Sequence, residues 1–244
     1  MQITLVQNAP KLNRKNLEFV VEEALTPKGH SACKAQIVVF SELSLSGYLL
    51  QDKLREDAFI LKELEPLCDA SKEIDIVVGG AINIGSEYFN CALYFSKGAL
   101  LSMHKKVHLP NYGMFEEARY FHSGEGFETF ETSYGTTAML VCEDVWHPNT
   151  AAQLYVKKPK IIYVLAASPA RGFKDDSLDI QEQWLALIRS LALHCHTKIV
   201  FVNRVGFEDG LGFWGGSCFI DENAKIVEQL PLFDEINKTI EVDI

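Results

Sequence analysis

The sequence is poor in positive charge and has no lysine-bearing phosphate loop. Its 23 Lys and Arg residues stand against 33 Asp and Glu residues, which gives a formal net charge of -10. This balance excludes nucleic acid as an expected partner, because phosphate backbones bind basic surfaces. The nucleotide-binding pattern G-x-x-x-x-G-K-[ST] does not occur either. We therefore expect neither nucleic acid nor an organic cofactor among the ligands.

Long apolar runs and paired cysteines are also missing. No stretch approaches the ~20 consecutive apolar residues that cross a bilayer. The first residues already have a strand pattern, with no basic leader before them. The six cysteines lie far apart without a C-x-x-C pair, which indicates neither a zinc site nor a disulfide framework. We expect a cytoplasmic protein that binds no membrane and no metal.

Apolar strands that alternate with helices dominate the rest of the chain. Hydrophobic residues make up 48% of the sequence and charged residues 23%, as in globular proteins. Strand patterns at 3–6, 35–40, 161–165 and 199–203 are very apolar, which is typical of strands covered on both faces. The pattern predicts a layered α/β fold. Hairpin-like pairs make its sheets mixed, and the length of 244 residues suits one domain over residues 1–244.

Several segments carry finer expectations. Residues 54–72 are expected to form a helix interrupted at Pro66. The strand at 74–78 is expected to close at Gly79-Gly80, and the glycine-rich run 206–216 is expected to be a loop. An apolar strand at 239–244 has no obvious partner, which hints at pairing with a second copy.

Three reactive residue types follow strand-like stretches at distant places in the chain. Cys142 ends the stretch 136–142, Glu42 follows the strand 35–40, and Lys106 enters the unpatterned segment 105–126. A buried cysteine is more often a small core residue, and glutamate and lysine are usually solvated. Together, however, a thiol, a base and an ammonium suit nucleophilic attack on a carbonyl carbon. We expect the turn after Cys142 to favour its thiolate.

With these residues the chain resembles the nitrilase superfamily, the carbon–nitrogen hydrolases, whose members carry a Glu-Lys-Cys triad. Glu42 lies in S-E-L-S-L-S-G-Y, Lys106 in K-V-H-L-P and Cys142 in L-V-C-E-D-V-W. Glu117, in E-E-A-R-Y-F, matches a second glutamate that the family places beside the triad. Ser41 stands where the family usually has proline, which we expect to loosen that turn slightly.

The resemblance implies a four-layer α-β-β-α sandwich that assembles as a homodimer or a larger homo-oligomer. It also implies a thioester mechanism in which Glu42 is the base and Lys106 and the backbone N–H of Glu143 hold the oxyanion. Glu117 would orient Lys106 or the substrate nitrogen. Further residues of the family segments are expected to bind substrate or line its pocket, namely Tyr48, Tyr112, Glu143 and Trp146.

The substrate is expected to be a small carboxamide, and ammonia the product. Within the family the motifs are closest to the glutaminase domain of glutamine-dependent NAD synthetases, for example in Gly47–Asp52 and Ala167–Pro169. An N-carbamoyl amino acid amidohydrolase or a nitrilase proper would carry the same triad and remains an alternative. So does an ammonia-supplying or binding subunit of a larger complex, since no S-G-G-x-D-S nucleotide loop occurs.

Overall fold

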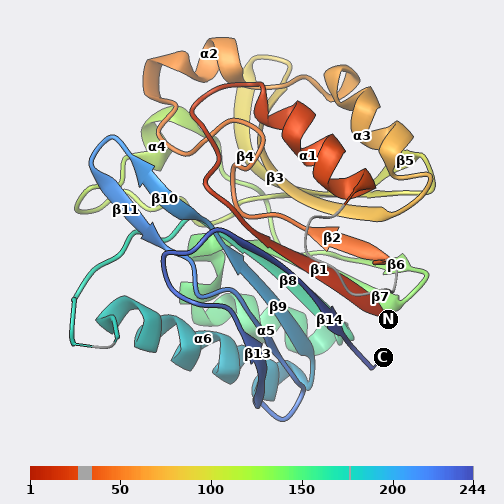
Figure 1. Cartoon of the computed structure of the whole chain (residues 1–244), viewed down its shortest axis with the longest axis vertical. Coiled ribbons are helices and arrows are strands. Elements are labelled where there is room, and N and C mark those ends of the chain that lie inside the picture. The colour runs from red at the N-terminus through yellow and green to blue at the C-terminus, as the bar shows by residue number, and fades with distance from the viewer. Residues whose placement is uncertain (27–34, 176, 244) are drawn as a thin grey trace.

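Two mixed sheets face each other in the computed structural model, which describes residues 1–26, 35–175 and 177–243 (Figure 1). In the first sheet the strand order is β14-β1-β2-β3-β4-β5. Parallel pairing of β1, β2 and β3 is flanked by antiparallel pairs. Its strands are β1 (Gln2–Gln7), β2 (Ile37–Val39), β3 (Asp75–Ile84), β4 (Glu87–Ser96), β5 (Ala99–Lys105) and β14 (Ile236–Glu241).

The second sheet repeats this plan. Its strand order is β13-β12-β9-β8-β7-β6, with a parallel centre of β7, β8 and β9 and antiparallel edges. The mixed character expected from the hairpin-like segments is therefore confirmed. Its strands are β6 (Thr129–Thr132), β7 (Gly135–Val141), β8 (Ile161–Ala166), β9 (Lys198–Asn203), β12 (Cys218–Ile220) and β13 (Ile226–Gln229).

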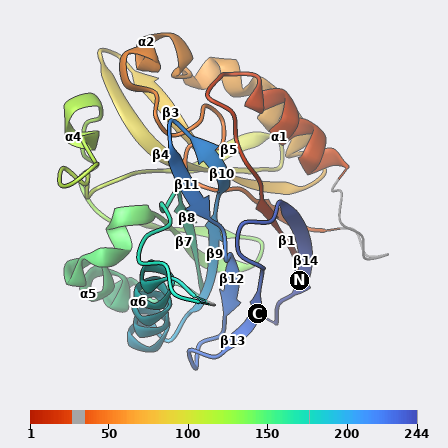
Figure 2. The ribbon, with the colours of Figure 1, turned by 60° about the vertical axis from the view of Figure 1, so that its left-hand side comes forward.

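Helices cover the outer face of each sheet and complete four layers. Helices α1 (Asn16–Leu25) and α3 (Glu65–Ala70) pack on the first sheet, and α5 (Pro148–Lys157) and α6 (Asp179–Cys195) on the second (Figure 2). Each sheet is covered on both faces, so successive residues of a strand are both apolar and point to opposite faces. In β8, for example, Ile162 faces the helices and Tyr163 faces the opposite sheet. One inner core contains residues of both sheets, which supports a single domain. The single domain over residues 1–244 stays a prediction.

The helix predicted at 54–72 needs correction. These residues do not form one interrupted helix but three short pieces, α2 (Leu54–Asp57), the 3-10 turn η2 (Leu61–Leu64) and α3, and a further 3-10 turn, η1 (Gln51–Lys53), precedes them. The chain leaves the helical path at Phe59, whose N–H donates to the Ala81 carbonyl of β3. Pro66 lies in the first turn of α3, where its missing N–H costs nothing.

The glycine-rich run 206–216 is not a loop but a hairpin. It contains β10 (Val205–Glu208) and β11 (Leu211–Trp214). Gly210, Gly212 and Gly215 have the spacing G-x-G-x-x-G, yet they lie in or beside a strand and open no helix, as a dinucleotide site requires. The C-terminal strand β14 pairs with β1 of the same chain, so the hint of an unpartnered strand was wrong.

Among the described residues, no helix is long and apolar enough to span a membrane, and the cytoplasmic location stays a prediction.

Gly79 sets how closely the segment that carries Glu42 can lie on the first sheet. Strand β3 does not close at Gly79-Gly80 but continues to Ile84. A Cβ added at Gly79 would lie 2.5 Å from the Leu43 nitrogen and 2.7 Å from the Glu42 Cα. The hydrogen bond from the Leu45 N–H to the Gly79 carbonyl, at 3.1 Å, fixes this contact. Only glycine lets the two backbones meet at this distance.

We expect Gly79→Ala to lower the free energy of unfolding by about 2 kcal/mol, because the added methyl group forces backbone apart. Urea denaturation measures this. Gly126→Ala is the matched control: its added Cβ would meet only the Gln153 side chain, at 3.6 Å. We expect its effect to stay within about 0.5 kcal/mol. Equal stability of Gly79→Ala and the wild type would contradict this role of Gly79.

Candidate active site

Glu42 enters the space between the two sheets from the turn that follows β2. Its side chain is 1% exposed. The turn is held by hydrogen bonds between Ser41 and Ser44: their hydroxyls lie 3.0 Å apart, and the Ser44 hydroxyl donates to the Ser41 carbonyl at 2.6 Å. The Ser41 hydroxyl thus adds a contact to this turn, and the slight loosening expected from serine in place of proline stays a prediction.

Lys106 follows β5 and is fully buried between two carboxylates. Its Nζ lies 2.8 Å from Oε1 of Glu42 and 2.8 Å from the carboxylate of Glu117. Glu117 begins the short helix α4 (Glu117–Tyr120) and is 6% exposed. Three of the four residues expected to carry the chemistry thus form one continuous buried ion cluster, although they are far apart in the sequence.

Cys142 lies at the end of β7, as the first residue of the 3-10 turn η3 (Cys142–Trp146). Its backbone has φ +46°, in the left-handed region that non-glycine residues rarely adopt. The charges of Glu42, Lys106 and Glu117 all act on its thiol, and the Ala167 N–H lowers the pKa of this thiol. The structure therefore brings Cys142 together with the buried ion cluster.

The thiol of Cys142 is protonated at neutral pH. Burial of its sulfur raises its pKa well above the ordinary value, the charges of Glu42 and Glu117 raise it further, and Lys106 lowers it only in part. The expectation that the following turn favours the thiolate stays a prediction, because these causes do not include that turn. Such a thiol needs a neighbouring base to become a nucleophile.

The cluster also perturbs its other members. The pKa of Glu117 is raised to about 7. Burial is the main cause, the charge of Glu42 adds to it, and the charge of Lys106 opposes it. Burial lowers the pKa of Lys106, but the charges of Glu117 and Glu42 outweigh burial and hold this pKa well above its usual range. Lys106 therefore stays an ammonium and offers a fixed positive charge beside Cys142.

Two groups that we did not predict hold the Glu42 carboxylate. The Asn90 amide donates to its Oε1 at 2.7 Å, and the Ala167 N–H donates to its Oε2 at 2.7 Å. Asn90 is 0% exposed in the apolar strand β4, so a lone polar residue within that strand was the signal that could have revealed it. The Ala167 N–H that Glu42 accepts also lowers the pKa of the Cys142 thiol, so one donor acts on both groups.

Comparison with known proteins identifies the family of this chain. The model of the carbon–nitrogen hydrolase family matches residues 2–244. The chain belongs to the carbon–nitrogen hydrolase family. It is 31% identical over 240 residues to a glutamine-dependent NAD(+) synthetase of Acinetobacter baylyi, a match that covers 96% of this chain. It spans only 42% of that relative's length.

Solved structures support the same fold. A glutamine-dependent NAD+ synthetase of Acinetobacter baumannii aligns with a TM-score of 0.83 and 29% identity, over 98% of this chain and 44% of that one. The NitN amidase of Nesterenkonia sp. AN1 aligns with a TM-score of 0.83 and 22% identity, over 100% of this chain and 93% of that one. The chain is thus a carbon–nitrogen hydrolase with the sandwich of the nitrilase superfamily, and the predicted enzyme class and fold are confirmed.

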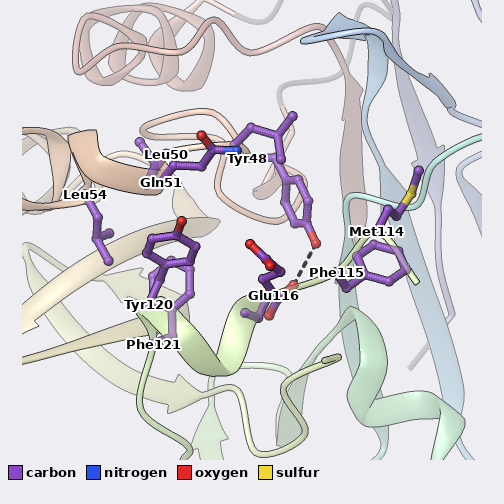
Figure 3. Close-up of a pocket in the computed structure, with 11 residues that line it drawn as sticks. Tyr48, Leu50, Gln51, Leu54, Met114, Phe115, Glu116, Tyr120 and Phe121 are labelled. Atoms are coloured by element: carbon purple, nitrogen blue, oxygen red, sulfur yellow. Dashed lines mark hydrogen bonds between the residues drawn. The ribbon is translucent and has the colours of Figure 1, made fainter. Parts of the chain in front are cut away.

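Tyr48 binds the same carboxylate oxygen of Glu117 as Lys106 does. Its hydroxyl donates to Glu117 Oε1 at 2.7 Å, and both side chains line a pocket between residues 48–54 and 114–121 (Figure 3). The backbone of Tyr48 is fixed in turn, because its N–H donates to Glu208 at 2.9 Å and Glu208 is paired with buried Arg204 at 2.7 Å. Apolar and aromatic side chains form much of the pocket wall, among them Leu50, Leu54, Phe115 and Phe121.

The other residues expected near the substrate lie in different surroundings. Tyr112 is exposed, and its hydroxyl donates to the Glu143 carboxylate at 2.9 Å. Trp146 packs edge-on against Trp184, with ring centroids 5.6 Å apart, and lines a groove beside α5 and α6. Trp146 therefore does not share the pocket of Tyr48 and Glu117.

Tyr48→Phe tests the electrostatics of this cluster. The Tyr48 hydroxyl lowers the pKa of Glu117, because a hydrogen bond to the charged form favours it. We expect the pKa of Glu117, about 7 in the wild type, to rise by roughly one pH unit in the variant. Titration of the carboxyl carbons by NMR measures it, with Glu117→Gln to assign the signal. An unchanged or lowered pKa would contradict this arrangement.

Proposed function

We propose that the protein is a thiol amidase that releases ammonia from a small carboxamide through Glu42, Lys106 and Cys142. The observation that carries this proposal is the position of the Glu42 carboxylate. It lies 2.8 Å from the Lys106 ammonium, accepts the Ala167 N–H at 2.7 Å, and its charge acts on the thiol of Cys142. A base, a charge for the oxyanion and a protonated nucleophile are thus in place without rearrangement.

The reaction proceeds in two halves. Glu42 takes the proton of Cys142, and the thiolate attacks the amide carbon. Lys106 and the backbone N–H of Glu143 stabilise the oxyanion. The carbon–nitrogen bond breaks while Glu42 returns its proton to the leaving ammonia, which leaves a thioester on Cys142. Glu42 then takes a proton from water, which attacks the thioester and releases a carboxylic acid and the thiol. Glu117 orients Lys106 throughout.

A glutamine-type substrate fits the surroundings of the nucleophile. The Glu143 carboxylate follows Cys142 directly and suits a substrate ammonium, which Tyr112 would help to place. Arg171 lies nearby, 5.7 Å from the Phe115 ring centroid, and suits a substrate carboxylate. The glutamine-dependent relatives support this choice and also a second candidate, in which the protein supplies ammonia to a larger assembly.

Ammonia release from a panel of substrates tests the proposal. We expect hydrolysis of glutamine or another small carboxamide, and loss of at least about 10³-fold in kcat for Cys142→Ala, because the nucleophile is removed. Cys68→Ala is the matched control, since Cys68 lies in α3 and is also partly buried. Release of carbon dioxide together with ammonia from N-carbamoyl amino acids would favour the amidohydrolase alternative. Normal turnover by Cys142→Ala would refute the mechanism.

We further propose that the protein forms a homodimer through α5 and α6. Exposed apolar side chains on these helices support this, namely Tyr155 (56% exposed), Val156 (76%) and Leu193 (52%). Tyr155 also lines the groove that contains Trp146. Apolar surface gathered on neighbouring helices is typical of an interface.

Light scattering after size-exclusion chromatography tests the dimer. We expect about twice the monomer mass for the wild type. The double variant with Tyr155→Asp and Leu193→Asp should have the monomer mass, because the new carboxylates would be buried in an apolar interface without partners. Phe207→Asp is the control: Phe207 is 83% exposed, but on the β10–β11 hairpin. A monomeric wild type at micromolar concentration would contradict the dimer.

A further inference from the structure

Asp144 is a buried carboxylate whose hydrogen bonds reach both sheets. It lies two residues after Cys142 in η3 and is 0% exposed. Its Oδ1 accepts the N–H groups of Val107 and His108, each at 3.0 Å. Its Oδ2 accepts the Val141 N–H at 3.0 Å and faces His104 Nε2 at 2.8 Å.

These four partners flank the two residues that our mechanism brings together. His104 and Val107 lie on either side of Lys106, at the end of β5 in the first sheet. Val141 precedes Cys142 at the end of β7 in the second sheet. One carboxylate therefore ties the Lys106 segment to the Cys142 turn across the sandwich.

The backbone of Cys142 gives a second reason for this link. Its φ of +46° is unfavourable for a residue with a Cβ and persists only where the surroundings enforce it. The Asp144 carboxylate caps the turn from within, because it accepts the N–H of Val141, the residue immediately before Cys142. Loss of this acceptor would let the turn relax toward ordinary geometry.

Resting on the proposed function, we propose that Asp144 is a positioning residue, which fixes the distance between Lys106 and Cys142 and holds Cys142 in its left-handed conformation. Its carboxylate bonds to His104 and to backbone N–H groups, not to the side chains of Glu42, Lys106 or Cys142. Burial alone raises the pKa of Asp144, but the hydrogen bond and charge of His104 and the bonds from backbone N–H groups outweigh burial and lower it. Asp144 therefore acts as a charged group that only accepts hydrogen bonds.

Asp144→Asn tests this role with little change of shape. The asparagine oxygen can still accept hydrogen bonds from Val107 and His108. Its NH2 group, however, would replace Oδ2 and face the Val141 N–H and His104, which are themselves donors. We expect an unchanged circular-dichroism spectrum and a fall of about 100-fold in kcat, since a misplacement of about 1 Å is enough for that loss. KM should stay roughly constant. Alkylation of Cys142 by iodoacetamide, followed by peptide mass spectrometry, should slow in parallel.

Asp75→Asn is the matched control for a purely structural effect. Asp75 is a partly buried carboxylate that accepts hydrogen bonds from Tyr94 at 2.8 Å and Ser96 at 2.6 Å, on the first sheet. We expect it to lose thermal stability but to keep kcat and the alkylation rate. His104→Leu removes one of the four partners and should lower kcat less than Asp144→Asn does. His104→Gln should restore kcat, because its amide N–H can take the place of Nε2.

The outcomes separate this inference from the proposed function. If the wild type hydrolyses no amide but Asp144→Asn still slows alkylation of Cys142, the proposed function fails and the positioning role stands. A folded Asp144→Asn that keeps the wild-type kcat and alkylation rate would overturn the role. So would activity that falls in Asp144→Asn and Asp75→Asn only in proportion to their loss of thermal stability. If Asp144→Asn does not fold, His104→Leu decides: an unchanged kcat and alkylation rate in this variant overturn the role.

Discussion

A buried ammonium between two carboxylates is the interaction on which the site depends. Lys106 is 0% exposed, and a lone charge at that depth would cost many kcal/mol. Glu42 and Glu117, each 2.8 Å from its Nζ, make this burial possible. The cluster carries more negative than positive charge, so part of it is available as a base. Burial, together with the charges of Glu42 and Glu117, keeps the thiol of Cys142 protonated until a proton acceptor acts on it. The stability of the cluster and its reactivity thus have one electrostatic origin.

The sandwich delivers these groups because strand ends from both sheets meet at one place. Glu42 and Lys106 follow strands of the first sheet, and Cys142 and Ala167 follow strands of the second. Gly79 lets the Glu42 turn lie against β3, and the Asp144 carboxylate joins the segments of Lys106 and Cys142. Apolar side chains on the inner faces, such as Tyr163 and Val200, hold the two sheets together. A glycine contact and one buried carboxylate therefore help to set distances between segments of the two sheets.

The sequence predicted those parts of the molecule that local patterns determine. Apolar runs gave the central strands, and ordered motifs gave Glu42, Lys106, Glu117 and Cys142, because each lies in a short, distinctive segment. The break in the helix predicted at 54–72 was missed, since it arises from a backbone hydrogen bond between Phe59 and β3. The β10–β11 hairpin was hidden by its glycines. Asn90, Ala167 and Asp144 act through contacts distant in sequence, and the raised pKa of Cys142 follows from three-dimensional burial, which no pattern reports.

Membership in the carbon–nitrogen hydrolases fixes the class of reaction, and the claim that remains central is a thioester on Cys142. The most direct measurement is acid quenching during steady-state turnover of the best amide substrate, followed by peptide mass spectrometry. Our account predicts the mass of the substrate's acyl group on the Cys142 peptide, at a fraction set by the rates of acylation and hydrolysis. An acyl group on another residue, or an unmodified Cys142 at every quench time while product accumulates, would contradict it.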